Sequence, residues 1–244
     1  MHPFLSAALA AALLAPALPS QAAVSLYTRQ AAYVGALKAQ GLASKQETFE
    51  NAGAWGDVRS TISGGFHTAQ SVLSKGVTWS ANFDGGEITT GDGAARRGSW
   101  GFFAYPHGAY GGPADCSLPG ACGDGFMGAS AAGFYAIGGW IRTNTPPADI
   151  NLFLDGKRFD FGAASQISTG YAFFGAISST PFHAFEFREM EGTAGELKYI
   201  FADDFRFALA PAVSALAVPE PSALALMLVG LGLTICVGRR RRQR

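Results

Sequence analysis

The sequence is poor in the residues that usually carry catalysis or hold metal ions. It has four histidines and three cysteines in 244 residues. No two histidines have the spacing of a metal-binding pair, and no serine lies in a nucleophile-elbow pattern. Glycine pairs such as Gly91-Asp92-Gly93 are not followed by the lysine of a phosphate-binding loop. We therefore predict no catalytic residues.

Charged residues are also scarce, at 15% of the chain, and they are unevenly distributed. The region between positions 23 and 217 contains 13 of the 18 basic residues and 17 of the 18 acidic residues. The net charge of zero therefore hides a central region of about −4. Because a nucleic-acid-binding domain needs a basic face, we expect no nucleic-acid partner.

Glycosidase chemistry needs two carboxylates that meet in space. Glu186, Glu189 and Glu191 lie near one another in the sequence. In a strand, Glu186 and Glu189 would point to opposite faces, which does not favour a catalytic pair. We therefore expect a protein without enzymatic activity.

The first 22 residues have the pattern of a secretory signal peptide. An apolar stretch from Phe4 to Leu18 is followed by Ser20-Gln21-Ala22, with small residues at the positions that specify cleavage. The residues before that stretch include His2 but no lysine or arginine, which departs from the usual pattern. We predict cleavage after Ala22.

A second apolar run, Ser222–Val237, is 16 residues long and uncharged. As a helix it covers roughly 24 Å, a little less than the ~30 Å hydrocarbon core of a membrane. The arginines that follow can reach the lipid headgroups and hold that end in the cytoplasm, so the rest of the chain lies on the far side. They are Arg239, Arg240, Arg241, Arg242 and Arg244.

The motif Val218-Pro219-Glu220-Pro221 directly precedes this run. Motif, apolar helix and terminal arginine cluster, in this order, resemble the PEP-CTERM sorting tail of exported proteins of Gram-negative bacteria. The resemblance implies a membrane transpeptidase of the exosortase type as a partner. It also implies export through the inner membrane, transient anchoring there by the C-terminal helix, and a final place at the cell surface or outside the cell. An ordinary single-pass C-terminal anchor is the alternative.

The chain thus divides into a signal peptide (1–22), an exported domain (23–212), a linker (213–217) and a sorting tail (218–244). The exported domain begins with one short helix over Arg29–Gln40, with Thr28 as its N-cap and Gly41 as its end. Tyr33 and Leu37 form the packing face of this helix.

Short alternating segments follow, separated by turn residues. Val77–Phe83 alternates apolar and polar side chains, and Ile150–Leu154 leads into an Asp155-Gly156 hairpin turn. Near the end, strict alternation places four aromatic residues on one face: Tyr199, Phe201, Phe205 and Phe207. A second set of residues shares one face of another segment: Tyr171, Phe173, Gly175 and Ile177. Phe185 and Phe187 share a further face. Many short strands with turn signals predict an all-β domain, an antiparallel β-sandwich of jelly-roll-like topology.

Two blocks carry a weaker resemblance. Leu26–Tyr33 together with Thr48-Phe49-Glu50 is similar to the opening of many exported PEP-CTERM proteins. Phe174–Phe182 together with Ala202–Phe205 is similar to the last strands of the same β-sandwich group. The resemblance implies the same fold, in a group of which some members bind carbohydrate.

Cys116 and Cys122 lie six positions apart, and Cys236 lies in the predicted membrane helix. In an oxidising compartment, Cys116 and Cys122 are expected to form a local disulfide. A metal site would need further ligands nearby, where only His107 is present, and a redox pair would need a two-residue spacing.

The segment Gly91–Gly133 holds 12 glycines in 43 residues, interspersed with aromatic residues. Glycine-rich loops approach other backbone or a ligand closely, and aromatic rings on loops can stack on sugar rings. The ligand-binding candidates are Trp100, Tyr105, His107 and Tyr110. The alternative is that these side chains only hold the loops in place.

Asp203 shares a face with Phe201 and Phe205 in strict alternation, where an unpaired carboxylate is costly. Either a bulge turns Asp203 outward, or it meets a cation. Because calcium prefers oxygen ligands, Glu50, Asp203 and Asp204 are candidate ligands of a structural calcium, the one cofactor that we consider. The alternative is a set of turn or surface carboxylates, with Asp204 paired to Arg206.

The sequence thus predicts a non-enzymatic protein of the cell envelope or extracellular matrix, associated with exopolysaccharide or biofilm. A carbohydrate-binding module that uses the loops of Gly91–Gly133 is the alternative.

Overall fold

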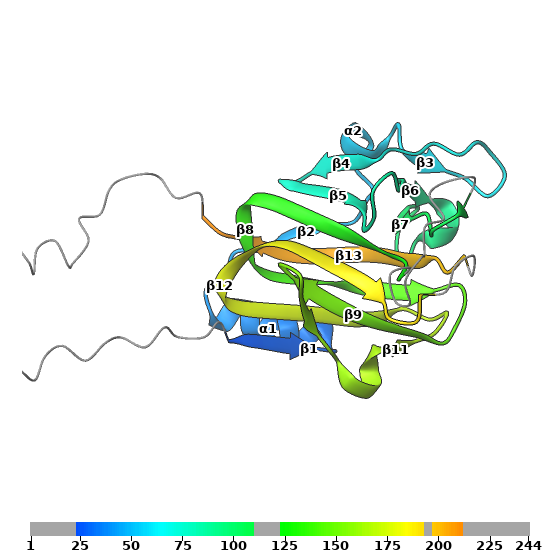
Figure 1. Ribbon diagram of the computed structural model, residues 1–244. Helices are drawn as coiled ribbons and strands as arrows, with labels where there is room; N and C mark the ends of the chain where they lie inside the picture. The colour runs from blue at the N-terminus through cyan, green and yellow to red at the C-terminus, as the bar shows by residue number, and fades with distance from the viewer. Residues whose placement is uncertain (1–22, 110–122, 193–196, 212–244) are drawn as a thin grey trace, which may run out of the picture. The chain divides into compact units, whose positions relative to one another are not determined.

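The computed structural model describes residues 23–109, 123–192 and 197–211 (Figure 1). The predicted signal peptide, the predicted disulfide of Cys116 and Cys122, Tyr110 and the sorting tail with its helix lie outside the described residues. Among the residues that are described, no helix is long and apolar enough to cross a membrane.

The described residues consist mainly of β-strands, which confirms the prediction of an all-β domain. Within the described ranges, two short α-helices are present, α1 (Gln30–Ala39) and α2 (Ala52–Trp55), and two 3-10 turns, η1 (Asp92–Ala94) and η3 (Gly162–Ser165). The strands are β1 (Val24–Tyr27), β2 (Lys45–Glu47), β3 (Arg59–Ser60), β4 (Ser71–Ser74), β5 (Val77–Ala81), β6 (Ile88–Gly91), β7 (Gly101–Ala104), β8 (Gly125–Thr143), β9 (Ala148–Leu154), β10 (Lys157–Phe159), β11 (Gln166–Ile167), β12 (Ala172–Glu189) and β13 (Ile200–Leu209).

Two long strands, β8 and β12, run side by side through the whole domain (Figure 1). Their register shifts between Ile177 and Ala184, and Gly133 of β8 has a positive φ of 78° there. The first half of β8 has two neighbours, β5 on one side and the second half of β12 on the other. This half of β12 pairs in turn with β9. The second half of β8 lies between β13 and the first half of β12. This half of β12 pairs in turn with β1. Both strands therefore pass from one layer into the other.

The pairing is antiparallel throughout this double layer, except that β3 and β6 pair in parallel. The aromatic core lies between the two layers. Trp79 of β5 and Phe185 of β12 come from one layer, and their rings lie 5.2 Å and 6.1 Å from the ring of Phe205 on β13. All three side chains are buried. Because aromatic pairs add about 0.5–1.5 kcal/mol each beyond their buried area, this cluster is a main source of stability.

Helix α1 covers the outer face of the second layer. Tyr33 and Leu37 are its buried residues, as predicted, and they pack on Phe173 and Ile177 of β12. The Tyr33 hydroxyl donates a hydrogen bond to the carbonyl oxygen of Arg206 (2.8 Å). The predicted N-cap was wrong by one residue: Arg29 occupies that position and its side chain makes no capping hydrogen bond.

The predicted hairpin turn at Asp155-Gly156 is confirmed. Both residues have positive φ values, 46° and 77°, which is the geometry that two-residue hairpins prefer. The Oδ1 atom of Asp155 also accepts hydrogen bonds from the backbone N–H groups of His183 (2.9 Å) and Ala184 (2.8 Å). The turn between β9 and β10 is thereby fixed to β12.

The first and last residues of the described domain lie at the end where β8 and β12 change layer. The N–H of Ala23 donates to Ser179 Oγ (3.0 Å), and the N–H of Ala210 donates to the carbonyl oxygen of Gly133 (2.9 Å). The outer ends of β8 and β12 lie at the opposite end (Figure 1). Arg142, near the end of β8, donates from Nη2 to the carbonyl oxygen of Gly93 (2.7 Å), so η1 lies at this end as well. We call this opposite end the distal end.

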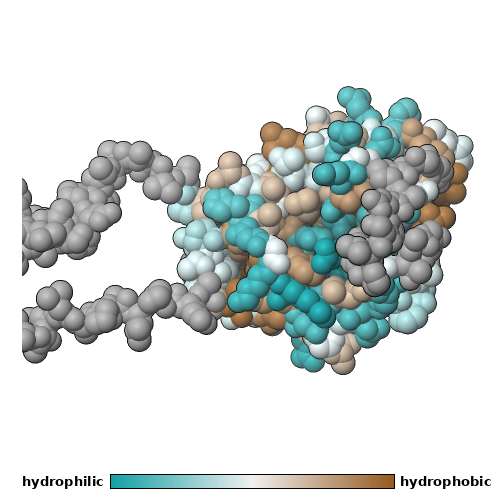
Figure 2. All heavy atoms as spheres, viewed as in Figure 1, coloured by the Kyte–Doolittle hydropathy of each residue, from teal (hydrophilic) through white to brown (hydrophobic). Residues whose placement is uncertain are grey.

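On the face seen in Figure 2, hydrophilic residues are spread over the surface, with smaller hydrophobic areas between them. Four large hydrophobic side chains are exposed in the described residues: Ile62, Phe66, Leu73 and Leu197. Isolated exposed apolar residues are common on soluble domains, but Ile62 and Phe66 share one loop.

Candidate functional site

The carboxylates of the last strand lie in a β-bulge. The register of β13 against β8 shifts between Asp203 and Arg206, and Asp204 has a positive φ of 51°. The bulge reverses the alternation, so that Phe205 lies in the core and Phe201 lies in a separate aromatic cluster. The prediction that Phe201 and Phe205 share a face was therefore wrong. A bulge near Asp203 is present, but it does not turn Asp203 outward, because this side chain is fully buried.

Asp203 holds the loop that follows η1. Its Oδ2 atom accepts hydrogen bonds from the backbone N–H groups of Arg96 (2.7 Å) and Arg97 (3.0 Å). Its Oδ1 atom accepts from the N–H of Asp204 (2.7 Å). Asp203 is fully buried, and this desolvation raises its pKa to about 6, although the three hydrogen bonds lower it. The contact between β13 and the loop therefore includes a carboxyl that titrates at mildly acidic pH.

Asp204 pairs with Arg96 rather than with the predicted Arg206. Arg96 Nη1 lies 2.7 Å from Asp204 Oδ2, and the guanidinium stacks 3.8 Å from the centroid of the Trp140 ring. The guanidinium of Arg206 instead donates to the side chains of Ser44 and Gln46. The bulge explains the difference, because it places consecutive side chains of β13 on different partners.

Glu50 anchors the other end of the same loop. Its Oε1 atom accepts hydrogen bonds from the backbone N–H groups of Ser99 (2.7 Å) and Trp100 (2.9 Å). Calcium would need oxygen ligands that face one point, whereas Glu50, Asp203 and Asp204 bind separate donors. In the described ranges, no group of three or more histidine, cysteine, aspartate or glutamate side chains could hold a metal ion.

Two of the three described ligand-binding candidates are buried. Tyr105 packs edge-on against Phe103 and Tyr199, with centroid distances of 5.6 Å and 6.1 Å. His107 is held by Asp124, whose Oδ1 atom lies 2.8 Å from the His107 backbone N and 2.9 Å from Nδ1.

The His107 ring also stacks on Phe83 at 3.7 Å. Tyr105 and His107 thus hold the loops in place, as the alternative predicted. Trp100 is partly exposed and lies 4.6 Å below the Arg59 guanidinium.

A buried polar cluster continues from Asp124 to the end of β12. The N–H of Asp124 donates to Glu189 Oε1 (3.1 Å), and Lys198 Nζ lies 2.6 Å from Glu189 Oε2. Glu186, in contrast, is partly exposed and accepts from Asn82 Nδ2 (3.0 Å). Glu186 and Glu189 therefore differ in burial and partners, as expected for opposite faces of a strand.

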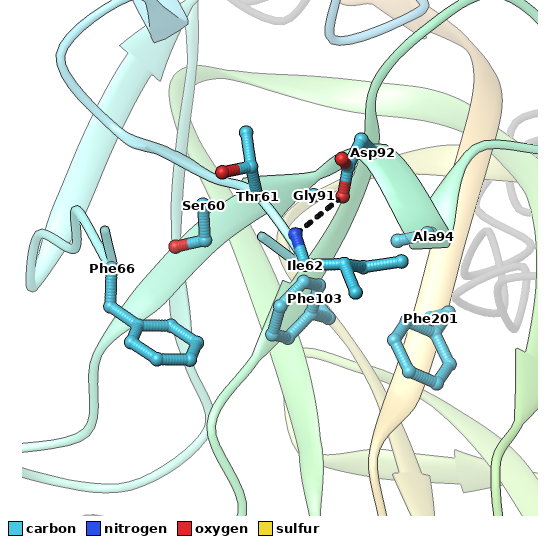
Figure 3. Close-up of a pocket in the computed structure, with 10 residues that line it drawn as sticks. Ser60, Thr61, Ile62, Phe66, Gly91, Asp92, Ala94, Phe103 and Phe201 are labelled. Atoms are coloured by element: carbon cyan, nitrogen blue, oxygen red, sulfur yellow. Dashed lines mark hydrogen bonds between the residues drawn. The ribbon is translucent and has the colours of Figure 1, made fainter. Parts of the chain in front are cut away.

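An open, mainly apolar cavity lies beside β6, β7 and β13, with a volume of about 270 Å³ (Figure 3). Phe103 and Phe201 line its floor, and their ring centroids lie 5.3 Å apart. The loop after β3 lines the opposite side with Ile62, which is 85% exposed, and Phe66, which is 60% exposed. Figure 3 shows that Asp92 Oδ1 accepts a hydrogen bond from the backbone N–H of Ile62 (3.0 Å), which holds this loop over the cavity.

The sequence did not identify these lining residues as site candidates. Phe201 was placed on the same face as Phe205, because strict alternation does not include the bulge at Asp204. Phe103 lies within the glycine-rich segment but was not selected from it. Ile62 and Phe66 could have been identified from the sequence. They are two large apolar residues in a short loop with Gly64 and Gly65, whereas the other loops are mainly polar. The arrangement offers apolar contact to one small ring or side chain.

Comparison with protein families finds the PEP-CTERM protein-sorting motif at residues 217–242. This confirms the predicted PEP-CTERM sorting motif, whereas the bounds of the tail and its helix stay predictions. The motif implies a secreted protein that is anchored transiently in a membrane, recognised by an exosortase, and then released to the surface or the exterior. Comparison with curated proteins finds no match.

Among solved structures, the chain is similar to the K2 cleaved adhesin domain of Lys-gingipain, with 15% identity and a TM-score of 0.38, covering 68% of this chain and 100% of that one. It is also similar to the CBM22-1 xylan-binding domain of Xyn10C from Paenibacillus barcinonensis, with 14% identity and a TM-score of 0.37, covering 69% of this chain and 94% of that one.

Proposed function

We propose that this chain is a non-enzymatic component of the cell envelope or extracellular matrix, associated with exopolysaccharide or biofilm. The observation that carries the proposal is the sorting motif at residues 217–242, which implies export and release to the surface or the exterior. The sequence offers no catalytic pattern, and Glu186 and Glu189 have separate partners on β12. A jelly-roll-like topology and a C-terminal membrane helix remain predictions within this proposal.

The way in which the chain leaves the domain supports a display role. Ala23 and Ala210 are both tied to the end where β8 and β12 change layer, through Ser179 and Gly133. The distal end carries the loop held by Asp203 and the end of β12. The distal end is therefore the end of the described domain that neither of these two chain connections occupies.

Cell fractionation tests this proposal. We expect the protein in the outer-surface or matrix fraction of a bacterium with an active exosortase, and its retention in the inner membrane when Pro219, Glu220 and Pro221 are all replaced by alanine. The matched control is Pro211→Ala. This proline precedes the sorting motif at residues 217–242, so its replacement should leave sorting unchanged. Equal distribution of the motif variant and the natural chain would contradict the proposal.

Carbohydrate binding through the loops of Gly91–Gly133 is a second candidate function. The cavity of Figure 3 favours it, because Phe103 and residues 91–94 come from this segment and line an open, mainly apolar cavity. Aromatic rings of this kind can pack on the apolar face of a sugar. A glycan array tests it, with Phe66→Ala as the variant expected to weaken binding at this cavity. An array without any bound glycan would rule it out.

A further inference from the structure

One wall of the cavity in Figure 3 belongs to a segment that lies between two strands. This segment, residues 92–100, consists of η1 and the loop that leads into β7, and we call it the strap. Its first three residues, Asp92, Gly93 and Ala94, line the cavity. Among the described strands, none pairs with the strap. Its position therefore depends on the side chains that reach it from other elements.

Two side chains hold the beginning of the strap. Arg142 of β8 donates from Nη2 to the carbonyl oxygen of Gly93 (2.7 Å). The hydroxyl group of Tyr171, the residue before β12, donates to the carbonyl oxygen of Ala94. Burial raises the pKa of Tyr171 to about 12, so this hydroxyl keeps its proton near neutral pH. A guanidinium also stays charged there, so neither contact changes with pH in that range.

The middle of the strap is held by the carboxyl group of Asp203, which is fully buried. Both strap contacts are made by one oxygen: Oδ2 accepts from the N–H groups of Arg96 (2.7 Å) and Arg97 (3.0 Å). The other oxygen, Oδ1, accepts from the N–H of Asp204 within β13 (2.7 Å). A proton on Oδ1 would replace only the bond within β13. The neutral carboxyl can therefore still hold the strap through Oδ2.

The charges around Asp203 do not compensate for its burial. Arg96 pairs with Asp204 (2.7 Å) and stacks on Trp140, the residue of β8 opposite Asp203. Desolvation therefore outweighs the three hydrogen bonds and raises the pKa of Asp203 to about 6. The charged or titratable groups around Asp203 are Asp204 on β13, Arg96 and Arg97 on the strap, Tyr171 before β12, and Arg142 of β8 beside Tyr171.

Lifting the strap would expose Asp203 to water and return its carboxyl group to ordinary acidity. The seated strap therefore binds a proton more tightly than the lifted strap does, and acid favours the seated state. We propose that the strap is a pH-controlled wall of the cavity in Figure 3, which one proton on Asp203 keeps seated on β13 and whose release follows loss of that proton. This proposal does not depend on an association with exopolysaccharide.

Hydrogen–deuterium exchange of the full chain in detergent tests the proposal at single residues. We compare pH ~7 with pH ~4.5, after correction for the intrinsic pH dependence of exchange. A pKa of about 6 in the seated state and 3.8 in the lifted state makes the Arg96 and Arg97 amides roughly 20-fold better protected at the lower pH. The control amides are those of His183 and Ala184, which an exposed carboxylate, Asp155, accepts, and they should show no such change.

Two variants test the parts of this device. Asp203→Asn cannot take up the proton, so the difference between the two pH values should disappear. Tyr171→Phe removes the hydroxyl that holds Ala94. If η1 and the rest of the strap move together, this variant should lower the protection of the Arg96 and Arg97 amides by about two- to tenfold at both pH values.

Each opposite result overturns the proposal. Equal protection at both pH values, or weaker protection in acid, would exclude a proton that seats the strap. Unchanged Arg96 and Arg97 amides in Tyr171→Phe would separate the cavity wall from the moving segment. The slowest amides of β8 and β12 report global unfolding, and exchange of Arg96 and Arg97 at that same rate would exclude a local movement. If Asp203→Asn does not fold, the pH comparison in the natural chain still decides.

Discussion

Replacing Gly138 by alanine tests how α1 is seated on the sheet. A Cβ atom at Gly138 would lie 2.9 Å from Phe173 Cζ and 3.0 Å from Tyr33 Cε1, closer than carbon atoms normally approach. Both rings are buried, so neither can move aside without disturbing its neighbours. Overpacking of this kind costs about 1–3 kcal/mol. For a domain of this size, that corresponds to a decrease in Tm of about 2–12 °C.

The matched control is Gly35→Ala on the exposed side of α1. A Cβ atom there would meet nothing within 4 Å. Alanine in a helix interior is up to about 1 kcal/mol more favourable than glycine, so this variant should be slightly more stable. Thermal unfolding followed by circular dichroism measures both. A Gly138→Ala variant as stable as the natural chain would refute the proposed packing of Tyr33 and Phe173 over β8.

Three further predictions concern buried side chains. The folded pKa of Asp203, about 6, exceeds the usual 3.8, so this group stabilises the fold at low pH and the effect is lost as pH rises through 3.8 to 6. Between pH ~7 and pH ~4.5, the free energy of unfolding of the natural chain should rise by about 2 kcal/mol more than that of Asp203→Asn, as measured by urea titration. The same pH dependence of the free energy of unfolding in both proteins would contradict this. Phe205→Ala, which removes a fully buried ring, should cost about 3–5 kcal/mol by the same titrations, and a loss below about 1 kcal/mol would exclude its central place in the core. Lys198→Met should cost about 3–5 kcal/mol because it leaves the Glu189 carboxylate buried without its cation, and adding Glu189→Gln should recover part of the loss. No recovery in the double variant would argue against the ion pair as the cause.

Local signals in the sequence predicted several elements well. The alternation of Val77–Ala81 located β5, and Asp155-Gly156 located the β9–β10 turn, because both depend on residues close in the sequence. The face of α1 followed from the spacing of Tyr33 and Leu37.

Features that depend on distant contacts could not be predicted in this way. Nothing in the sequence of β12 indicates that its two halves belong to different layers, because that follows from its pairing with β8. The positive φ of Asp204 is likewise set by the bulge and not by a glycine, so Phe201 was placed on the same face as Phe205. Asp203 was identified as unusual, but its actual partners, the backbone N–H groups of Arg96 and Arg97, lie about a hundred residues away in the sequence.

Candidate residues chosen by type alone were the least reliable. Tyr105 and His107 have side chains that often bind ligands, yet packing against Tyr199 and Phe83 buries them.

The mature carboxyl terminus tests the central claim most directly. The protein should be isolated from the surface or matrix of a bacterium with an active exosortase and its intact mass measured. We predict a carboxyl terminus near Val218–Pro221, with the apolar run and the arginine cluster removed. A mature surface protein that still ends at Arg244 would contradict processing of the tail and favour an ordinary membrane anchor.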